Sequence, residues 1–173
     1  MAAPSRILEF NLSAIRILCV DDHPLFREGI ATVIAHQSDM DLVALAATGS
    51  EAVQLQRQQQ LDITLLDLRL PDMSGIAVIR EMLADWPGAR VIVLTNLEGD
   101  ADIQQAMDAG ARAYMLESSP GDRLVDCIRK VYRGRTHLQC SVAQTLAGCR
   151  EKLRARDRTQ SVAIGIRRGI IQV

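Results

Sequence analysis

The sequence predicts an α/β fold with a doubly wound parallel sheet, because short apolar runs alternate with helical patterns over residues 15–134. The runs are rich in leucine or β-branched residues and are bounded by polar residues, which is typical of strands buried on both faces of a parallel sheet. Three of the runs lead into Asp or Thr, and open α/β sheets place their binding sites at the carboxyl ends of the strands. We therefore expect a binding site at one edge of this sheet.

The expected elements form five strand and helix pairs. Strands are expected near 15–20, 41–47, 62–67, 90–95 and 113–116. Helices are expected over about 24–36, from about 50, over about 74–85, ending near 109–110, and over about 120–133. The predicted inner helix faces consist of Leu25, Ile30, Val33 and Ile34 in the first helix and Leu124, Ile128 and Val131 in the last. Five such units predict a flavodoxin-like (βα)5 sheet with strand order 2-1-3-4-5.

The chain has 173 residues, of which 48% are hydrophobic, and this is enough for one packed domain. We expect an N-terminal extension over 1–14, one domain over 15–134 and a basic, linker-like tail over 135–173. Within the tail, 141–155 is compatible with a helix, whereas 161–173 has no helical period. The formal net charge of -1 neither favours nor excludes binding to nucleic acid.

The cysteine pattern and the hydropathy indicate an intracellular protein. The four cysteines fall in no zinc-binding spacing and are expected to be reduced thiols: Cys19, Cys127, Cys140 and Cys149. No run reaches the roughly 18 consecutive apolar residues of a membrane span, and 1–14 lacks the apolar core of a signal peptide. The sequence therefore predicts a cytoplasmic protein with no membrane partner.

Acidic residues follow two of the expected strands. Asp21 and Asp22 follow the first strand, and Asp67 follows the third. Carboxylates at one edge of a sheet repel one another unless they share a positive charge, and oxygen ligands suit a hard cation such as Mg2+. A single aspartate at such a position often caps the next helix, which is the alternative for each of the three. Their arrangement together favours a site for a metal ion and a phosphoryl group.

The chain resembles the receiver domain of two-component response regulators, and among them the NarL/FixJ type, in motifs at 17–27, 67–75 and 109–116. The resemblance implies that Asp67 accepts a phosphoryl group from a sensor histidine kinase. It also implies Mg2+ as the cofactor. The implied metal ligands are Asp21, Asp22, Asp67 and the backbone carbonyl of Arg69.

The resemblance also implies a switch at the ends of the last two strands. Thr95 would hydrogen-bond the phosphoryl group while Tyr114 changes rotamer to fill the vacated space. Two simpler alternatives stay open from the sequence alone. The Thr95 hydroxyl can bond to its own backbone, and Tyr114 can be a half-buried aromatic residue in an edge strand.

Glu117 departs from the family pattern, because receivers carry a lysine at this position. Reversing a unit charge about 4 Å from an anion turns an attraction of roughly 1 to 4 kcal/mol into a repulsion of similar size. The departure predicts impaired phosphorylation or a phosphorylation-independent receiver. In another alternative, Glu117 points to solvent and an arginine such as Arg112 replaces the lysine.

Regulators of the NarL/FixJ type continue into a helix-turn-helix module, and the predicted tail is too short for its helices. We expect a chain that ends before this module, that does not bind DNA and that is not an enzyme. The alternative is a DNA-binding transcriptional regulator whose tail completes a binding unit in a homodimer. A phosphatase of the haloacid-dehalogenase type is a third candidate, but its second aspartate is replaced here by Arg69.

Overall fold

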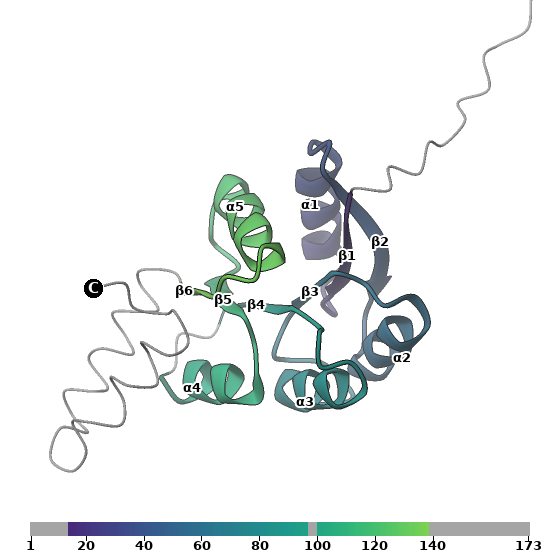
Figure 1. Cartoon of the computed structure of the whole chain (residues 1–173), viewed down its shortest axis with the longest axis vertical. Coiled ribbons are helices and arrows are strands. Elements are labelled where there is room, and N and C mark those ends of the chain that lie inside the picture. The colour runs from purple at the N-terminus through teal and green to yellow at the C-terminus, as the bar shows by residue number, and fades with distance from the viewer. Residues whose placement is uncertain (1–13, 97–99, 139–173) are drawn as a thin grey trace, which may run out of the picture.

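The computed structural model describes residues 14–96 and 100–138. Its parallel sheet has the strand order β2-β1-β3-β4-β5-β6 (Figure 1). The strands are β1 (Ile15–Val20), β2 (Met40–Ala46), β3 (Ile63–Leu66), β4 (Val91–Thr95), β5 (Ala113–Leu116) and β6 (His137–Leu138). The helices are α1 (Pro24–Ala35), α2 (Gly49–Gln59), α3 (Gly75–Asp85), α4 (Asp100–Ala109) and α5 (Gly121–Tyr132). The predicted order of the first five strands is confirmed.

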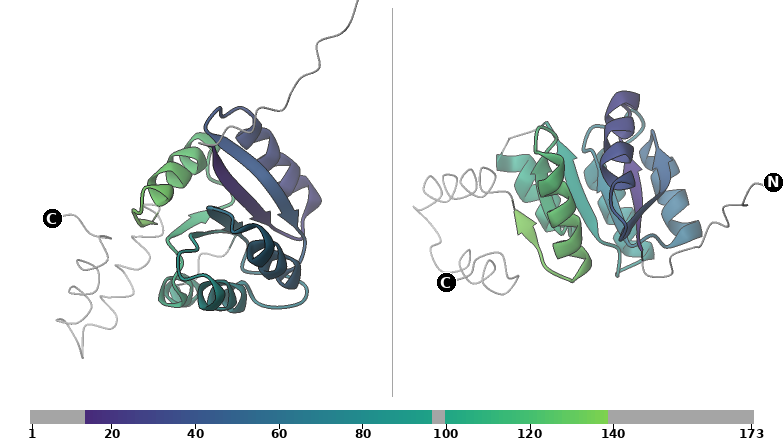
Figure 2. Two further views of the ribbon diagram at one scale, coloured as in Figure 1. Left: turned by 45° about the vertical axis from the view of Figure 1, so that its right-hand side comes forward. Right: turned by 90° about the horizontal axis from the view of Figure 1, so that it is seen from above.

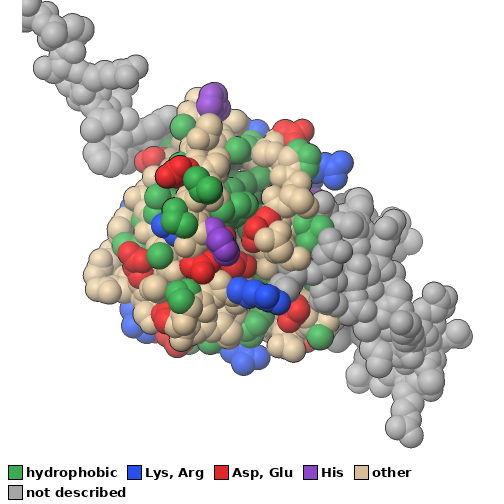
Figure 3. Space-filling view, turned by 180° about the vertical axis from the view of Figure 1, so that it is seen from behind, with side chains coloured by type: hydrophobic (Ala, Val, Ile, Leu, Met, Phe, Trp, Pro, Cys, Tyr) green, Lys and Arg blue, Asp and Glu red, His purple; other side chains and the backbone are tan. Residues whose placement is uncertain are grey.

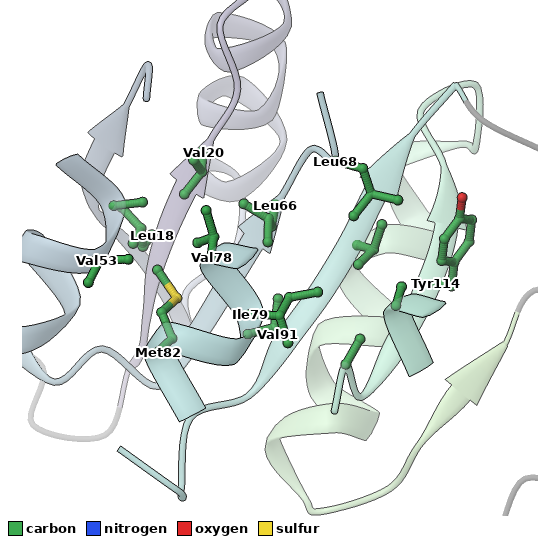
Figure 4. Packing of buried hydrophobic residues seen from close by; sticks show 14 of the residues in the cluster. Leu18, Val20, Val53, Leu66, Leu68, Val78, Ile79, Met82, Val91 and Tyr114 are labelled. Atoms are coloured by element: carbon green, nitrogen blue, oxygen red, sulfur yellow. The ribbon is translucent and has the colours of Figure 1, made fainter. Parts of the chain in front are cut away.

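The helices cover both faces of the sheet. Helices α1 and α5 lie on one face, and α2, α3 and α4 lie on the other (Figures 1 and 2). Each face has its own apolar cluster, and Figure 4 shows the one beneath α2, α3 and α4. Because both faces of the central strands are covered, β3 and β4 are buried at every position, as their unbroken apolar character predicts.

The sixth strand was not predicted from the sequence. His137 and Leu138 pair with Ala113 and Tyr114, and the His137 amide donates to the Arg112 carbonyl at 2.9 Å. A strand of two residues is too short to produce a recognisable hydrophobic period. The sheet therefore extends beyond the predicted domain end at Gly134, while the domain limits themselves stay predictions. The expected extension before residue 14 and the tail after 138 lie outside the described residues.

The predicted inner face of α1 is correct except at Leu25. Ile30 and Ile34 are buried and Val33 packs against them, but Leu25 is 82% exposed. Phe26 packs on the cluster instead. The reason is helical geometry. Phe26 lies four residues before Ile30 and shares its face of the helix, whereas Leu25 lies five residues before Ile30 and therefore on a different face. The predicted inner face of α5 is confirmed, since Leu124, Ile128 and Val131 are all buried.

The two described cysteines, Cys19 and Cys127, are buried free thiols. Burial raises the pKa of each to about 12, so both stay protonated at neutral pH. Among the helices within the described residues, none combines the length and apolar character needed to cross a bilayer.

Local contacts fix the loop between β3 and α3. Ser74 caps α3 by accepting a hydrogen bond from the Ala77 amide at 3.2 Å. A Cβ atom on Gly75 would lie 2.6 Å from the carbonyl oxygen of Asp67 and 2.7 Å from the Cα atom of Leu68, so only glycine allows this approach. The loop therefore passes directly beside the end of β3.

Asp72, in the same loop, caps the neighbouring helix α2. Its two carboxylate oxygens accept hydrogen bonds from the Gly49 amide at 2.8 Å and the Ser50 amide at 2.9 Å. These are first-turn amides that have no partner within the helix. Hydrogen bonds from Ser50, and then from Gly49, lower the pKa of Asp72 to about 2. The contact ties the loop after β3 to α2.

We expect Asp72→Ala to lower the melting temperature, because two helix amides lose their acceptor. A carboxyl with a lowered folded-state pKa stabilises the fold above its ordinary pKa, and this contribution is lost as the pH falls through the folded value. The melting temperatures of wild type and Asp72→Ala should therefore differ most near neutral pH and converge as the pH falls from about 4 towards about 2. A difference that does not change over this range would contradict the capping account.

Candidate functional site

Four neighbouring strands bring polar residues to one edge of the sheet. Asp21 follows β1, Asp67 follows β3, Thr95 ends β4 and Glu117 follows β5. Because these strands are parallel neighbours, their carboxyl ends meet at the same edge. We call Asp21, Asp67 and Glu117 the acidic cluster. A carboxylate oxygen of each lies within 4.8 Å of carboxylate oxygens of the other two.

Asp67 lies at the centre of this edge. It is 5% exposed, and its amide donates to the carbonyl oxygen of Val20 at 2.9 Å, which joins the ends of β1 and β3. Burial raises the pKa of the Asp67 carboxyl, and the negative charge of Asp21 adds to this effect. Hydrogen bonds from the Arg69 amide and the Thr95 hydroxyl oppose the rise. Asp67 is thus a buried carboxylate whose negative charge is only partly compensated.

Asp21 and Asp22 differ in their surroundings although they are adjacent. Asp21 is 1% exposed, and its Oδ1 accepts a hydrogen bond from the His23 amide at 2.7 Å. The Asp22 side chain is 40% exposed and faces Nδ1 of His23 at 2.9 Å. Arg27 donates to the backbone carbonyl of Asp21 and not to its carboxylate. Asp21 therefore points into the cluster, while Asp22 lies at its rim.

His23 is largely exposed beside both aspartates. Its Nδ1 lies 3.1 Å from Asp21 and 2.9 Å from Asp22. The hydrogen bond to Asp21, followed by the charge of Asp22, raises the pKa of His23. Figure 3 shows acidic side chains around an exposed histidine on this face of the molecule.

Glu117 lies in the cluster and does not point to solvent. Its side chain is half-buried, and its Oε2 accepts a hydrogen bond from the Asn96 amide group at 2.7 Å. Burial raises the pKa of Glu117, and repulsion by Asp67 and then Asp21 raises it further. The alternative in which Arg112 replaces the lysine is wrong, because Arg112 precedes β5 and lies at the opposite end of the strand.

Tyr114 lies inside the molecule and not at a sheet edge. It is fully buried in the cluster beneath α4, and β6 pairs on the outer side of β5 (Figure 4). The half-buried edge position is therefore wrong. Burial raises the pKa of the Tyr114 hydroxyl, with smaller contributions from Asp102 and Asp67. The rotamer switch with Thr95, which is also buried, stays a prediction.

Sequence reasoning missed two residues of the site. Asn96 holds the Glu117 carboxylate, and Arg27 holds the loop that follows β1. Both stand beside or within motifs that were recognised, Asn96 directly after Thr95 and Arg27 at the end of 17–27. Their contacts depend on tertiary structure, so the motifs alone gave them no role. Arg69 is exposed, and its function as a carbonyl ligand stays a prediction.

A five-unit α/β fold with carboxylates at the ends of β1 and β3 defines a receiver domain. The family description of the response regulator receiver domain matches residues 17–129. The chain therefore belongs to the response regulator receiver family, whose members are signalling proteins of two-component systems. This result confirms the resemblance seen in the sequence.

Among known proteins, the chain is similar to VraR from Staphylococcus aureus, with 34% identity over 122 residues, 70% of this chain and 58% of VraR. It is 27% identical to the transcriptional regulatory protein DegU from Brevibacillus brevis over 159 residues, which are 92% of this chain and 67% of DegU. The chain thus spans less than two thirds of the length of VraR.

Solved structures show the same fold. A LuxR-family two-component response regulator from Aurantimonas sp. SI85-9A1 matches with a TM-score of 0.76 and 36% identity, over 80% of this chain and 99% of that one. The receiver domain of NarL from Mycobacterium tuberculosis matches with a TM-score of 0.68 and 29% identity, over 71% of this chain and 99% of that one.

Proposed function

We propose that this receiver accepts a phosphoryl group on Asp67 from a sensor histidine kinase, with Mg2+ as the cofactor. The observation that carries the proposal is the position of Asp67. It is a buried carboxylate at the end of the central strand, next to the Thr95 hydroxyl and a second buried carboxylate, Asp21.

The donor set fits a hard divalent cation. Asp21 and Asp67 offer buried carboxylate oxygens within one group, and Asp22 adjoins Asp21 at the rim. The backbone carbonyl of Arg69 would complete the protein ligands. A bound Mg2+ ion offsets the charge on the phosphoryl oxygens and aligns donor and acceptor.

The protein's own groups perform the remaining steps. The Asp67 carboxylate attacks phosphorus, and its new O–P bond forms as the P–N bond to the kinase histidine breaks, with the electron pair leaving on that histidine. Thr95, already hydrogen-bonded to Asp67, would then donate to a phosphoryl oxygen. Glu117 places a negative charge next to this position and limits the yield. Tyr114 would respond by a change of rotamer.

The experiment is intact mass spectrometry after incubation with a small phosphodonor and Mg2+. We expect a low but detectable addition of one phosphoryl group to wild type and none to Asp67→Asn. Asp108→Asn, on the exposed surface of α4, is the matched control and should label like wild type. Equal labelling of wild type and Asp67→Asn would remove Asp67 as the acceptor, and with it the proposed function.

A second candidate is transcriptional regulation through DNA, in which the chain acts as a homodimer. It is favoured by the match to DegU, which is named a transcriptional regulatory protein and covers 92% of this chain. The basic residues after 149 would supply phosphate contacts. A salt-dependent gel shift tests it, and retention of a DNA fragment only at low salt would indicate non-specific binding.

A further inference from the structure

The acidic cluster carries more negative charge than the contacts around it compensate. Within the described part of the chain, neither Asp67 nor Glu117 forms an ion pair with a lysine or arginine. Two cationic groups lie nearby: Arg27 donates to the backbone carbonyl of Asp21, and the exposed His23 ring lies 3.1 Å from the Asp21 carboxylate. In the pattern that the family resemblance implies, a lysine would contribute a positive charge where Glu117 contributes a negative one.

Two hydrogen bonds to consecutive residues at the end of β4 hold Glu117 in this position. Its amide donates to the carbonyl oxygen of Thr95 at 3.2 Å, which fixes its backbone beside the end of β4. Its Oε2 accepts from the Asn96 side chain at 2.7 Å, which fixes its carboxylate. A carboxylate can accept this bond and still offer lone pairs to a cation. The side chain is therefore oriented towards Asp21 and Asp67 before any ligand binds.

We propose that Glu117 is itself a ligand for the divalent cation, so that Asp21, Asp67 and Glu117 bind it through three carboxylates. The inference rests on the proposed function, because it concerns the same metal site and the same acceptor residue. Oxygen ligands of one Ca2+ ion at about 2.4 Å can lie up to about 4.8 Å apart, which is compatible with the separations in the cluster.

The proposal has a consequence for the choice of cation. Mg2+ keeps several waters and is usually bound through one or two carboxylates, whereas Ca2+ takes six to eight oxygen ligands in flexible geometry. A third carboxylate should therefore strengthen the binding of Ca2+ more than that of Mg2+. It also makes the charge of the loaded site more negative by two units than a lysine at this position would. The departure from the family pattern then favours cation binding over phosphoryl binding.

Calorimetric titration of the full, metal-stripped chain with Ca2+ and with Mg2+ tests the inference. We compare wild type, Glu117→Gln, Asp67→Asn and Glu81→Gln, and a melting curve verifies that each variant is folded. Glu81 lies on the exposed surface of α3, so its substitution removes the same charge outside the site. We expect Glu117→Gln to weaken Ca2+ binding at least about tenfold and Mg2+ binding by a smaller factor. Glu81→Gln should bind both ions like wild type.

The outcomes separate this inference from the proposed function. If Glu117→Gln binds both ions like wild type while Asp67→Asn binds them weakly, Glu117 is not a ligand and the Asp67 site stands. If Glu117→Gln weakens the binding of Ca2+ and of Mg2+ by the same factor, the effect is one of long-range charge and the inference is overturned. The inference is also overturned if Glu81→Gln weakens binding as much as Glu117→Gln does. If Asp67→Asn also binds like wild type, both the inference and the proposed metal site are overturned.

Discussion

Phosphoryl labelling of Asp67 is expected to rise about tenfold, equivalent to about 1.4 kcal/mol, when Glu117 is replaced by lysine. The Glu117 carboxylate lies within 4.8 Å of Asp67, so the substitution turns a repulsion of the phosphoryl oxygens into an attraction. We expect less than the roughly 2 kcal/mol of the weakest full reversal, because Glu117 is only half-buried and solvent screens its charge. The measurement is the phosphorylated fraction by intact mass, followed over time after the donor is removed.

Two variants make this test specific. Glu117→Gln removes the negative charge without adding a positive one and should give an intermediate yield. Glu81→Lys makes the same charge reversal on the exposed surface of α3 and should label like wild type. Glu117→Lys should also lose affinity for the divalent cation while it gains phosphoryl label. A yield in Glu117→Lys that is no higher than in wild type would show that Glu117 does not oppose the phosphoryl charge.

The sheet could be predicted because its strands carry a strong local signal. The runs ending at Val20, Leu66 and Thr95 are nearly all apolar, and only burial on both faces of a sheet explains such runs between polar segments. The order 2-1-3-4-5 followed from five right-handed βα units, and the sequence positions of Asp21 and Asp67 then placed both at one edge.

The errors in the fold occurred where the local signal is weak. Leu25 stands at the start of a helix, where one turn gives too few positions to fix the apolar face, and it is exposed. The pair His137 and Leu138 forms a strand only because the edge of β5 offers free backbone groups. That pairing also places Tyr114 inside the sheet, and its ring is buried in the cluster that α4 helps to form.

The orientation of Glu117 could not be predicted, since its identity was visible in the sequence but its direction was not. The side chain of a residue at the end of β5 can point either to solvent or into the acidic cluster. The Asn96 side chain, at the end of the neighbouring strand, decides between them through one hydrogen bond. The contact joins residues 21 positions apart, so the hydrophobic periodicity of the sequence does not predict it.

Asp67→Asn is expected to raise the melting temperature of the cation-free protein by a few degrees near neutral pH. Burial, and to a smaller extent the charge of Asp21, disfavours the ionised form of Asp67. The pKa of its carboxyl is raised for this reason. Asparagine keeps an oxygen that can accept from the Thr95 hydroxyl, but it carries no charge. Asp22→Asn should have a smaller effect in the same direction, because the Asp22 side chain is 40% exposed.

The difference in melting temperature between wild type and Asp67→Asn should depend on pH. An acid whose pKa is raised by folding binds protons more tightly in the folded state, so its contribution to stability falls as the pH rises through the raised value. With a chelator present, Asp67→Asn and wild type should melt at similar temperatures near pH 4 and should separate as the pH increases. Saturating divalent cation should narrow the separation, because wild type binds the ion and gains stability by mass action. If cation-free Asp67→Asn melts below wild type throughout this range, the hydrogen bonds to Asp67 outweigh the repulsion, and the cluster has no need of a cation.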